Sequence, residues 1–233
     1  MLHSLLHHQL VSAVAAESLS PLALAPIIPV AWNMPGPTWA HISTISMLSL
    51  QIDIGVVYQR PEISESNNSK AVLARQIASK SLHDMLSALS QHLTDLDIGF
   101  RIDGGFKEEY PAHFGLTLPD VFFPQLDRLA YAGFSDKTGQ FTNFLFKHAN
   151  TLTSVALENV NLGSQSLSVL FSALKKLGLR SVTLSGVPVG NDSLEMVDFT
   201  NAPDLSDEFE EALKTKNAKE FEEWCALELI SPW

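Results

Sequence analysis

A short apolar pattern recurs six times along the chain and constrains its fold more than any other feature. Each copy has the spacing apolar-x-x-apolar-x-apolar, and the first residues of successive copies are 26, 48, 33, 26 and 27 positions apart. The copies are Leu19/Leu22/Leu24, Ile45/Leu48/Leu50, Leu93/Leu96/Ile98, Leu126/Leu129/Tyr131, Leu152/Val155/Leu157 and Leu179/Val182/Leu184. Because the last two apolar positions of each copy alternate, each copy predicts a short strand with one buried face.

Segments with helical periodicity lie between these strands. Apolar residues three and four positions apart predict helices within 2–14, 73–89, 141–148 and 167–177. Ser164 is a reasonable N-cap for the last of these helices, and Gly178 is a reasonable C-terminal cap. Neither a lone strand nor a lone helix of this size can bury its apolar face, whereas stacked neighbours can, so the pattern predicts a solenoid.

The two long intervals between copies require insertions. The polar, turn-rich segment 59–70 predicts an exposed loop within one repeat. The second long interval is predicted to be another irregular insertion that need not contain a helix, because it includes Gly104, Gly105, Pro111, Pro119 and Pro124.

The segment from 204 to 233 differs from the repeats in charge. It contains nine acidic residues and three lysines, more than half of the net charge of the whole chain. Phe209, Leu213, Phe221, Trp224 and Leu229 form a helical apolar stripe within it. Because a terminal repeat needs a polar outer face, this segment predicts a capping helix or pair of helices. We therefore expect a repeat domain over 1–203 and an acidic helical cap over 204–233.

Charge and cysteine content exclude several classes of function. The 15 basic and 26 acidic residues give a formal net charge of -11, which argues against non-specific binding to nucleic acid or to an anionic membrane surface. A single cysteine, Cys225, rules out an internal disulfide or a cysteine-rich zinc site. The N-terminal apolar stretch is interrupted by histidines, Glu17 and prolines, so it predicts neither a membrane span nor a signal peptide. We expect an intracellular protein, cytoplasmic or nuclear.

No residue pattern supports catalysis or a cofactor. His3 and His7 share a helix face, but no carboxylate or cysteine follows at a metal-ligand spacing. The acidic residues Asp95, Asp97 and Asp103, followed by Glu108 and Glu109, lack a calcium-loop pattern and a paired base, which favours a solvated edge. There is no Gly-x-Ser-x-Gly turn, and Cys225 beside Trp224 favours a packed thiol. We expect no enzyme, metal site or cofactor.

Three segments carry a resemblance to a known family. They are FPQLDRLAYAGF (123–134), FLFKHANTLTSVALENVNLGSQSL (144–167) and LGLRSVTLSGV (177–187). These segments resemble the leucine-rich-repeat region of fungal F-box-type proteins, in which a helix ends in a histidine and Thr-Leu opens the next strand, as His148 and Thr151-Leu152 do here. The position of the family's asparagine ladder is held by Val160, and by Phe134 and Val187 in the neighbouring units.

The resemblance implies an α/β solenoid of about six leucine-rich-repeat-like units, whose strands line a concave binding face. Outward-facing strand residues would then contact a protein partner, especially Asp95, Asp97, Arg128, Ser154, Glu158, Thr183 and Ser185. The implied function is that of a protein-binding module, like the substrate-recognition region of an F-box-type ubiquitin-ligase receptor. A ligase adaptor would be a partner only if an F-box lies outside this chain. The alternatives are a non-ligase scaffold or a truncated orphan fragment without catalytic activity, and a solvated sheet face with no partner.

Overall fold

The fold is mixed α/β, with helices packed on a mostly parallel sheet that is not closed into a barrel. The computed structural model describes residues 22–24, 46–53, 83–101, 112–113, 118, 120–136, 138–202 and 204–232. Ten strands of one sheet lie within these residues. The coarse prediction of an α/β chain is therefore confirmed.

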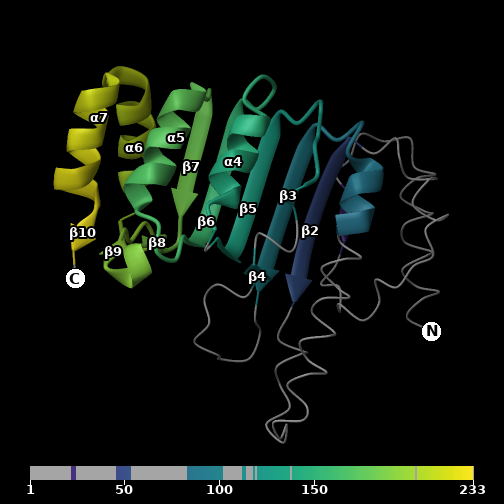
Figure 1. Ribbon diagram of the computed structural model, residues 1–233, viewed down its shortest axis with the longest axis horizontal. Helices are drawn as coiled ribbons and strands as arrows, with labels where there is room; N and C mark the ends of the chain where they lie inside the picture. Colours follow the sequence, from purple (N-terminus) through teal and green to yellow (C-terminus); the bar gives the residue numbers. More distant parts are fainter. Residues whose placement is uncertain are drawn as a thin grey trace, which may run out of the picture.

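Six parallel strands form the body of the sheet, and each contains the last two apolar positions of one copy of the repeated pattern. Most of these strands are labelled in Figure 1. In spatial order the six strands are β1 (Leu22–Leu24), β2 (Met47–Asp53), β3 (Asp95–Arg101), β5 (Arg128–Ser135), β6 (Ser154–Asn161) and β7 (Ser181–Ser185). The short β4 (Ala112–His113) pairs with the end of β5. The predicted strands are thus confirmed at all six copies.

The register of these strands aligns the apolar residues of successive copies. The aligned sets are Leu48–Leu96–Leu129–Val155–Val182 and Leu50–Ile98–Tyr131–Leu157–Leu184. None of these ten side chains is more than 3% exposed. A shift of one residue would turn a whole set to the opposite face, so the apolar spacing fixes the register.

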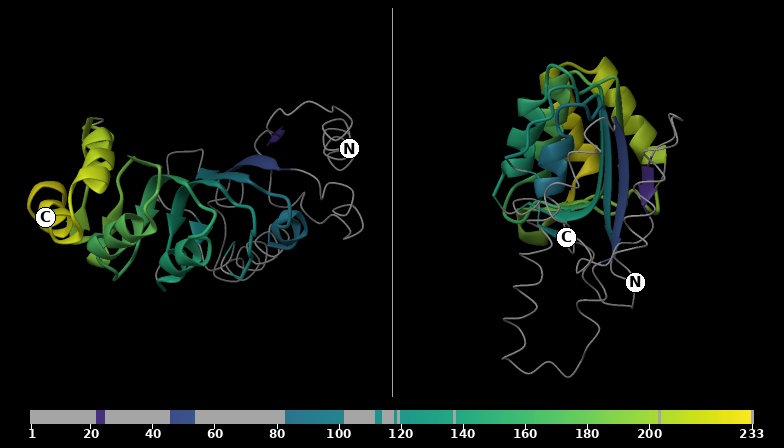
Figure 2. Two further views of the ribbon diagram at one scale, coloured as in Figure 1. Left: turned by 90° about the horizontal axis from the view of Figure 1, so that it is seen from above. Right: turned by 90° about the vertical axis from the view of Figure 1, so that its right-hand side faces the viewer.

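The helices between the strands lie on one side of the sheet, as both views in Figure 2 show. Residues 83–89 are helical, followed by α4 (Gln140–Lys147) and α5 (Leu167–Leu177). Each helix buries an apolar stripe, such as Phe141, Phe144 and Leu145 in α4. The predicted helices are confirmed here. The segments 2–14, 59–70 and 104–111, most of 73–89, and Pro119 lie outside the described residues.

The ends of α4 and α5 depend on side chains that accept from free backbone N–H groups. The buried Asp136 carboxylate accepts from the N–H groups of Gln140 and Phe141, at 3.3 and 2.9 Å. The N-cap of α5 is Ser166, whose Oγ accepts from Ser168 at 3.1 Å, so the prediction of Ser164 is wrong by two residues. Gly163, with φ 58°, and the turn that follows it delay the helix start. Gly178 caps the other end with φ 61°, as predicted.

Two helices close the β7 end of the sheet (Figures 1 and 2). They are α6 (Asp204–Thr215) and α7 (Ala218–Trp224), which continues as the π-helical turn η5 (Cys225–Leu229). A small antiparallel extension lies beside them, formed by β8 (Val189–Gly190), β9 (Glu195–Met196) and β10 (Ser231–Pro232), with the 3-10 turn η4 (Asn191–Ser193) between β8 and β9.

The predicted packing of the C-terminal apolar stripe is confirmed. Phe209 is fully buried, and its ring centroid lies 4.9 Å from that of Phe171 in α5 and 5.5 Å from that of Phe221 in α7. The hydroxyl of Ser206 in α6 accepts from the backbone N–H of Leu184 at 3.1 Å. That hydrogen bond satisfies a donor on edge strand β7, which would otherwise be open to pairing with another chain.

Candidate functional site

The side chains between the core positions form three straight rows on the sheet face opposite α4 and α5, which we call the open face. Residues of one row are paired in register across neighbouring strands. The first row is Met47, Asp95, Arg128, Ser154 and Ser181; the second is Ser49, Asp97, Ala130, Ala156 and Thr183; the third is Gly99, Ala132, Glu158 and Ser185. All seven residues predicted to bind a partner lie in these rows. Arg128, Glu158 and Thr183 are exposed, and the other four are half-buried.

A ladder of backbone hydrogen bonds fixes where each strand begins, and therefore where each row lies. The carbonyl oxygen of Ser46 accepts from the N–H groups of Thr94 and Asp95, at 2.8 and 3.0 Å. The carbonyls of Thr94, Asp127 and Thr153 each accept in the same way from two N–H groups at the start of the next strand. We call these four acceptors the carbonyl ladder. It aligns the starts of the five strands β2, β3, β5, β6 and β7, because each strand start is hydrogen-bonded to the one before it.

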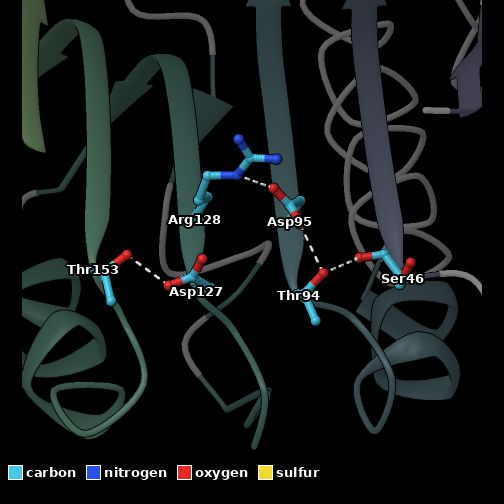
Figure 3. Close-up of polar contacts among 6 residues, drawn as sticks. All are labelled: Ser46, Thr94, Asp95, Asp127, Arg128 and Thr153. Atoms are coloured by element: carbon cyan, nitrogen blue, oxygen red, sulfur yellow. Dashed lines mark hydrogen bonds and ion pairs between the residues drawn. The ribbon is translucent and has the colours of Figure 1, made fainter. Parts of the chain in front are cut away.

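Polar side chains reinforce the carbonyl ladder, as Figure 3 shows. The hydroxyl of Thr153 donates to the Asp127 carboxylate at 2.6 Å. The hydroxyl of Thr94 lies 3.0 Å from the carbonyl oxygen of Ser46 and 2.7 Å from a carboxylate oxygen of Asp95. Since a hydroxyl has one proton, it donates to one of these acceptors at a time. At any moment Thr94 therefore either orients the Asp95 carboxylate or supports the strand start.

Asp95 and Arg128 form an ion pair across the first row (Figure 3). The guanidinium Nε of Arg128 donates to the Asp95 carboxylate. The Arg128 side chain is 56% exposed and that of Asp95 is 20% exposed. An ion pair this accessible to water contributes little to stability, typically 0–1 kcal/mol. Its main effect is that the two charges largely neutralise each other on this part of the open face.

A depression of about 280 Å³ lies beside this pair, over strands β3, β5, β6 and β7. Its lining is small or acidic on the open face: Asp97, Ala130, Ala132, Ala156, Glu158 and Ser185, with Phe100, Tyr131, Gly133 and Asn159 completing it. The Asp97 carboxylate accepts from the Ser49 hydroxyl at 2.8 Å. The structure thus brings together three of the predicted residues, Asp97, Glu158 and Ser185. Ser154 and Thr183 lie in the rows outside this depression.

Residues with left-handed backbone conformation lie at the ends of three strands, and two of them, Gly133 and Asn159, line the depression. Gly133, Asn159 and Gly186 have φ of 70°, 51° and 69°. Each lies two positions after the last apolar residue of its copy, so the three occupy equivalent positions of successive units. The side-chain oxygen of Asn159 accepts from the backbone N–H of Val187 at 2.9 Å. Asn159 thus bridges two repeats from the position just before the buried Val160.

Cys225 is buried, as predicted for a packed thiol. Burial raises the pKa of this thiol to about 12, with a further contribution from the negative charge of Glu222. His3, His7, Asp103, Glu108 and Glu109 lie outside the described residues. Within the part of the chain that the structure describes, no group of three His, Cys, Asp or Glu side chains is arranged to hold a metal ion.

No helix among the described residues has the length and apolarity needed to cross a bilayer. Comparison with protein-family models, with curated proteins and with solved structures found no significant match to the chain.

Proposed function

We propose that this chain is a leucine-rich-repeat-type solenoid that binds a protein partner on its open face, resembling the substrate-recognition region of an F-box-type ubiquitin-ligase receptor. The observation that carries the proposal is the common register of five strands, which turns scattered outward residues into continuous rows. Rows of this kind provide an extended surface without a deep pocket, as repeat proteins use for binding polypeptides.

Three structural features support the repeat assignment. The strands are parallel and follow the chain order from β1 to β7, apart from the short β4. The helices that connect them lie on one side (Figure 2). The carbonyl ladder and the left-handed residues Gly133, Asn159 and Gly186 recur at equivalent positions of successive units. Strands, helices and turns that recur at equivalent positions of successive units are typical of a solenoid built from one type of repeat.

The dimensions of the open face suit a polypeptide better than a small molecule. Five strands at about 4.8 Å spacing give a row of roughly 19 Å, which matches about six residues of an extended segment. The depression of about 280 Å³ is at the small end of the range for ligand pockets, and half of its described lining is alanine or acidic, with Phe100 and Tyr131 as its aromatic residues. Because the described part of the rows contains no tryptophan or tyrosine anchor, we expect moderate affinity rather than a tight permanent complex.

The same face serves either of two cellular roles. With an F-box outside this chain, a bound partner would be a substrate for ubiquitin transfer. Without one, the module would be a non-ligase scaffold or a fragment of a larger solenoid. Both roles use the open face, so the test of the face comes first.

The test is affinity purification followed by chemical cross-linking and mass spectrometry, with a blocked and a control variant. The blocked variant carries Ala130→Arg and Thr183→Arg, which place two long side chains in the second row. The control carries Asn143→Arg and Val169→Arg, which add the same charge on exposed positions of α4 and α5. We expect cross-links to the open face and loss of the partner from the blocked variant alone. A partner that both variants retain would contradict the proposal. Recovery of ligase adaptor subunits would favour the ligase role.

A further inference from the structure

We propose that the open face selects a basic polypeptide, and that a lysine or arginine side chain of this partner enters the depression between Asp97 and Glu158. This inference rests on the proposed function and adds the chemistry of the partner. It comes from the distribution of charge over the three rows, which is uneven in a way that the sequence order does not reveal.

The charge of the open face is concentrated at the depression. Arg128 is the sole basic side chain in the described part of the three rows, and its guanidinium is bound to Asp95. Among the described residues that line the depression there is no lysine, arginine or histidine, whereas the carboxylates of Asp97 and Glu158 both line it. Because Asp95 and Arg128 neutralise each other, two negative charges remain without a cationic partner among the described residues of this site.

The geometry lets one cation interact with both carboxylates. Asp97 is on β3 and Glu158 is on β6, with only β5 between them, so their strands are about 10 Å apart. The surface between them is formed by Ala130, Ala132 and Ala156, whose methyl groups leave room for a long side chain. The aliphatic stem of a lysine or arginine can lie on these methyl groups while its charged end contacts the carboxylates.

The asymmetry between the two acids favours a ligand that reaches into the depression rather than one that rests on its rim. Asp97 is half-buried and held by the Ser49 hydroxyl, whereas Glu158 is exposed. A charge-assisted hydrogen bond to a partly desolvated, oriented carboxylate is stronger than one to a mobile, solvated carboxylate. The net charge of -11 also attracts a basic partner from a distance, and repels an acidic one.

The experiment is a selection of phage-displayed random ten-residue peptides on the purified full chain. Enriched peptides are then made synthetically, and their binding is measured by fluorescence anisotropy against three variants. Asp97→Asn with Glu158→Gln removes the two charges of the depression. Glu208→Gln with Glu211→Gln removes two exposed charges from α6 and is the matched control. Ala130→Arg with Thr183→Arg blocks the open face. Urea unfolding of each variant shows that it is folded.

We expect enriched peptides that contain lysine or arginine, with binding at least tenfold weaker for the first variant and changed less than about twofold for the control. Replacing the peptide's arginine by citrulline, its neutral analogue, should weaken binding to a similar extent. Equal losses in both charge variants would show general attraction to an acidic protein and overturn the inference. Peptides without basic residues that the blocked variant fails to bind would overturn it while leaving the proposed function intact. No enrichment, or binding insensitive to the block, would overturn both.

Discussion

The Nε2 atom of His148 accepts a hydrogen bond of 3.0 Å from the backbone N–H of Phe123, 25 positions earlier in the chain. The other ring nitrogen, Nδ1, lies 2.8 Å from the carbonyl oxygen of Phe144. A carbonyl can only accept, so Nδ1 has the proton and Nε2 has the lone pair, which assigns a neutral imidazole. The buried ring therefore joins the end of α4 to the segment before β5, and only its uncharged form makes both bonds.

His148 gives the fold a defined dependence on pH. Burial lowers the pKa of His148 below its ordinary value of 6.5, an effect that the nearby charge of Lys147 reinforces, while the hydrogen bond to Phe144 opposes it. The unfolded chain thus binds a proton more readily than the folded chain. The stability from neutral His148 is fully present above pH 6.5 and is lost as the pH falls below that value.

Replacing His148 with leucine should remove this pH dependence and destabilise the protein. The backbone N–H of Phe123 would lose its acceptor, which costs about 1–3 kcal/mol. Urea unfolding between pH 5.5 and 8 measures both effects. His92→Gln, at an exposed position, is the control and should keep the wild-type pH profile. An unchanged profile in His148→Leu would contradict this account.

Two structural constraints favour glycine at position 133, a positive φ and a close backbone contact, whereas only the positive φ applies at Gly178. Both have positive φ, at 70° and 61°, where a side chain costs about 1–2 kcal/mol. A Cβ at Gly133 would also overlap the carbonyl oxygen of Phe100, whereas nothing lies within 4 Å of one at Gly178. We expect Gly133→Ala to lower the free energy of unfolding clearly more than Gly178→Ala, by urea denaturation. Equal effects would mean that the chain relaxes around the new methyl group.

Asn159 has a left-handed backbone conformation and a side chain that accepts a hydrogen bond, and two substitutions separate the effects of these features on stability. Asn159→Gly loses the hydrogen bond to the Val187 N–H but relieves the left-handed conformation. Asn159→Ala loses the same bond and keeps the conformational cost. We expect both variants to be destabilised, alanine by about 1 kcal/mol more than glycine. The difference in urea midpoint is the measurement, and a glycine variant as unstable as the alanine variant would show that the side-chain bond dominates.

The Cys225 thiol should resist alkylation in the folded protein. Burial and the charge of Glu222 raise its pKa to about 12, so little thiolate exists at pH 8. Mass spectrometry after treatment with iodoacetamide should show labelling at least about 100-fold slower than in guanidinium chloride. Phe209→Ala removes a buried ring from the same cluster, costs about 3–5 kcal/mol, and should accelerate labelling. Rapid labelling of the native wild-type chain would contradict the packed position of this cysteine.

Arg128→Ala should change the free energy of unfolding by less than about 1 kcal/mol, because its ion pair with Asp95 is accessible to water. Thermal unfolding checks this. A large destabilisation would mean that Arg128 supports the sheet, and the variant could then not be used to examine binding.

The apolar spacing predicted the rows of the open face because strand alternation and register follow from it directly. The alternation puts Asp95 and Arg128 at equivalent positions of their copies, directly before the central apolar residue, although they are 33 positions apart in the chain. Their ion pair, and the depression shared by Asp97 and Glu158, depend on which strands become neighbours, and β3 pairs directly with β5. The sequence pattern predicts this order of strands, but it does not predict the depression.

Other features depend on contacts that no short pattern reports. The expected asparagine position is Val160, which is buried, whereas Asn159 makes the bridge one residue earlier from a left-handed conformation. The repetition of Gly133, Asn159 and Gly186 at the same offset was an available signal, since these residue types favour positive φ. His148 belongs to the motif that carries the family resemblance, but its hydrogen bond to Phe123 depends on how consecutive units stack. The role of Asp136 as acceptor for the backbone N–H groups of α4 is indicated in the sequence only by its position before that helix.

The carbonyl ladder also determines how this molecule should respond to mechanical force. The carbonyl ladder ties each strand start to the strand before it, so tension applied along the row of strands pulls on these interfaces in series, and the weakest one separates first. Tension applied parallel to the strands would instead load all the hydrogen bonds between two strands at once. The protein should therefore peel apart unit by unit at low force in the first geometry and resist as a single body in the second.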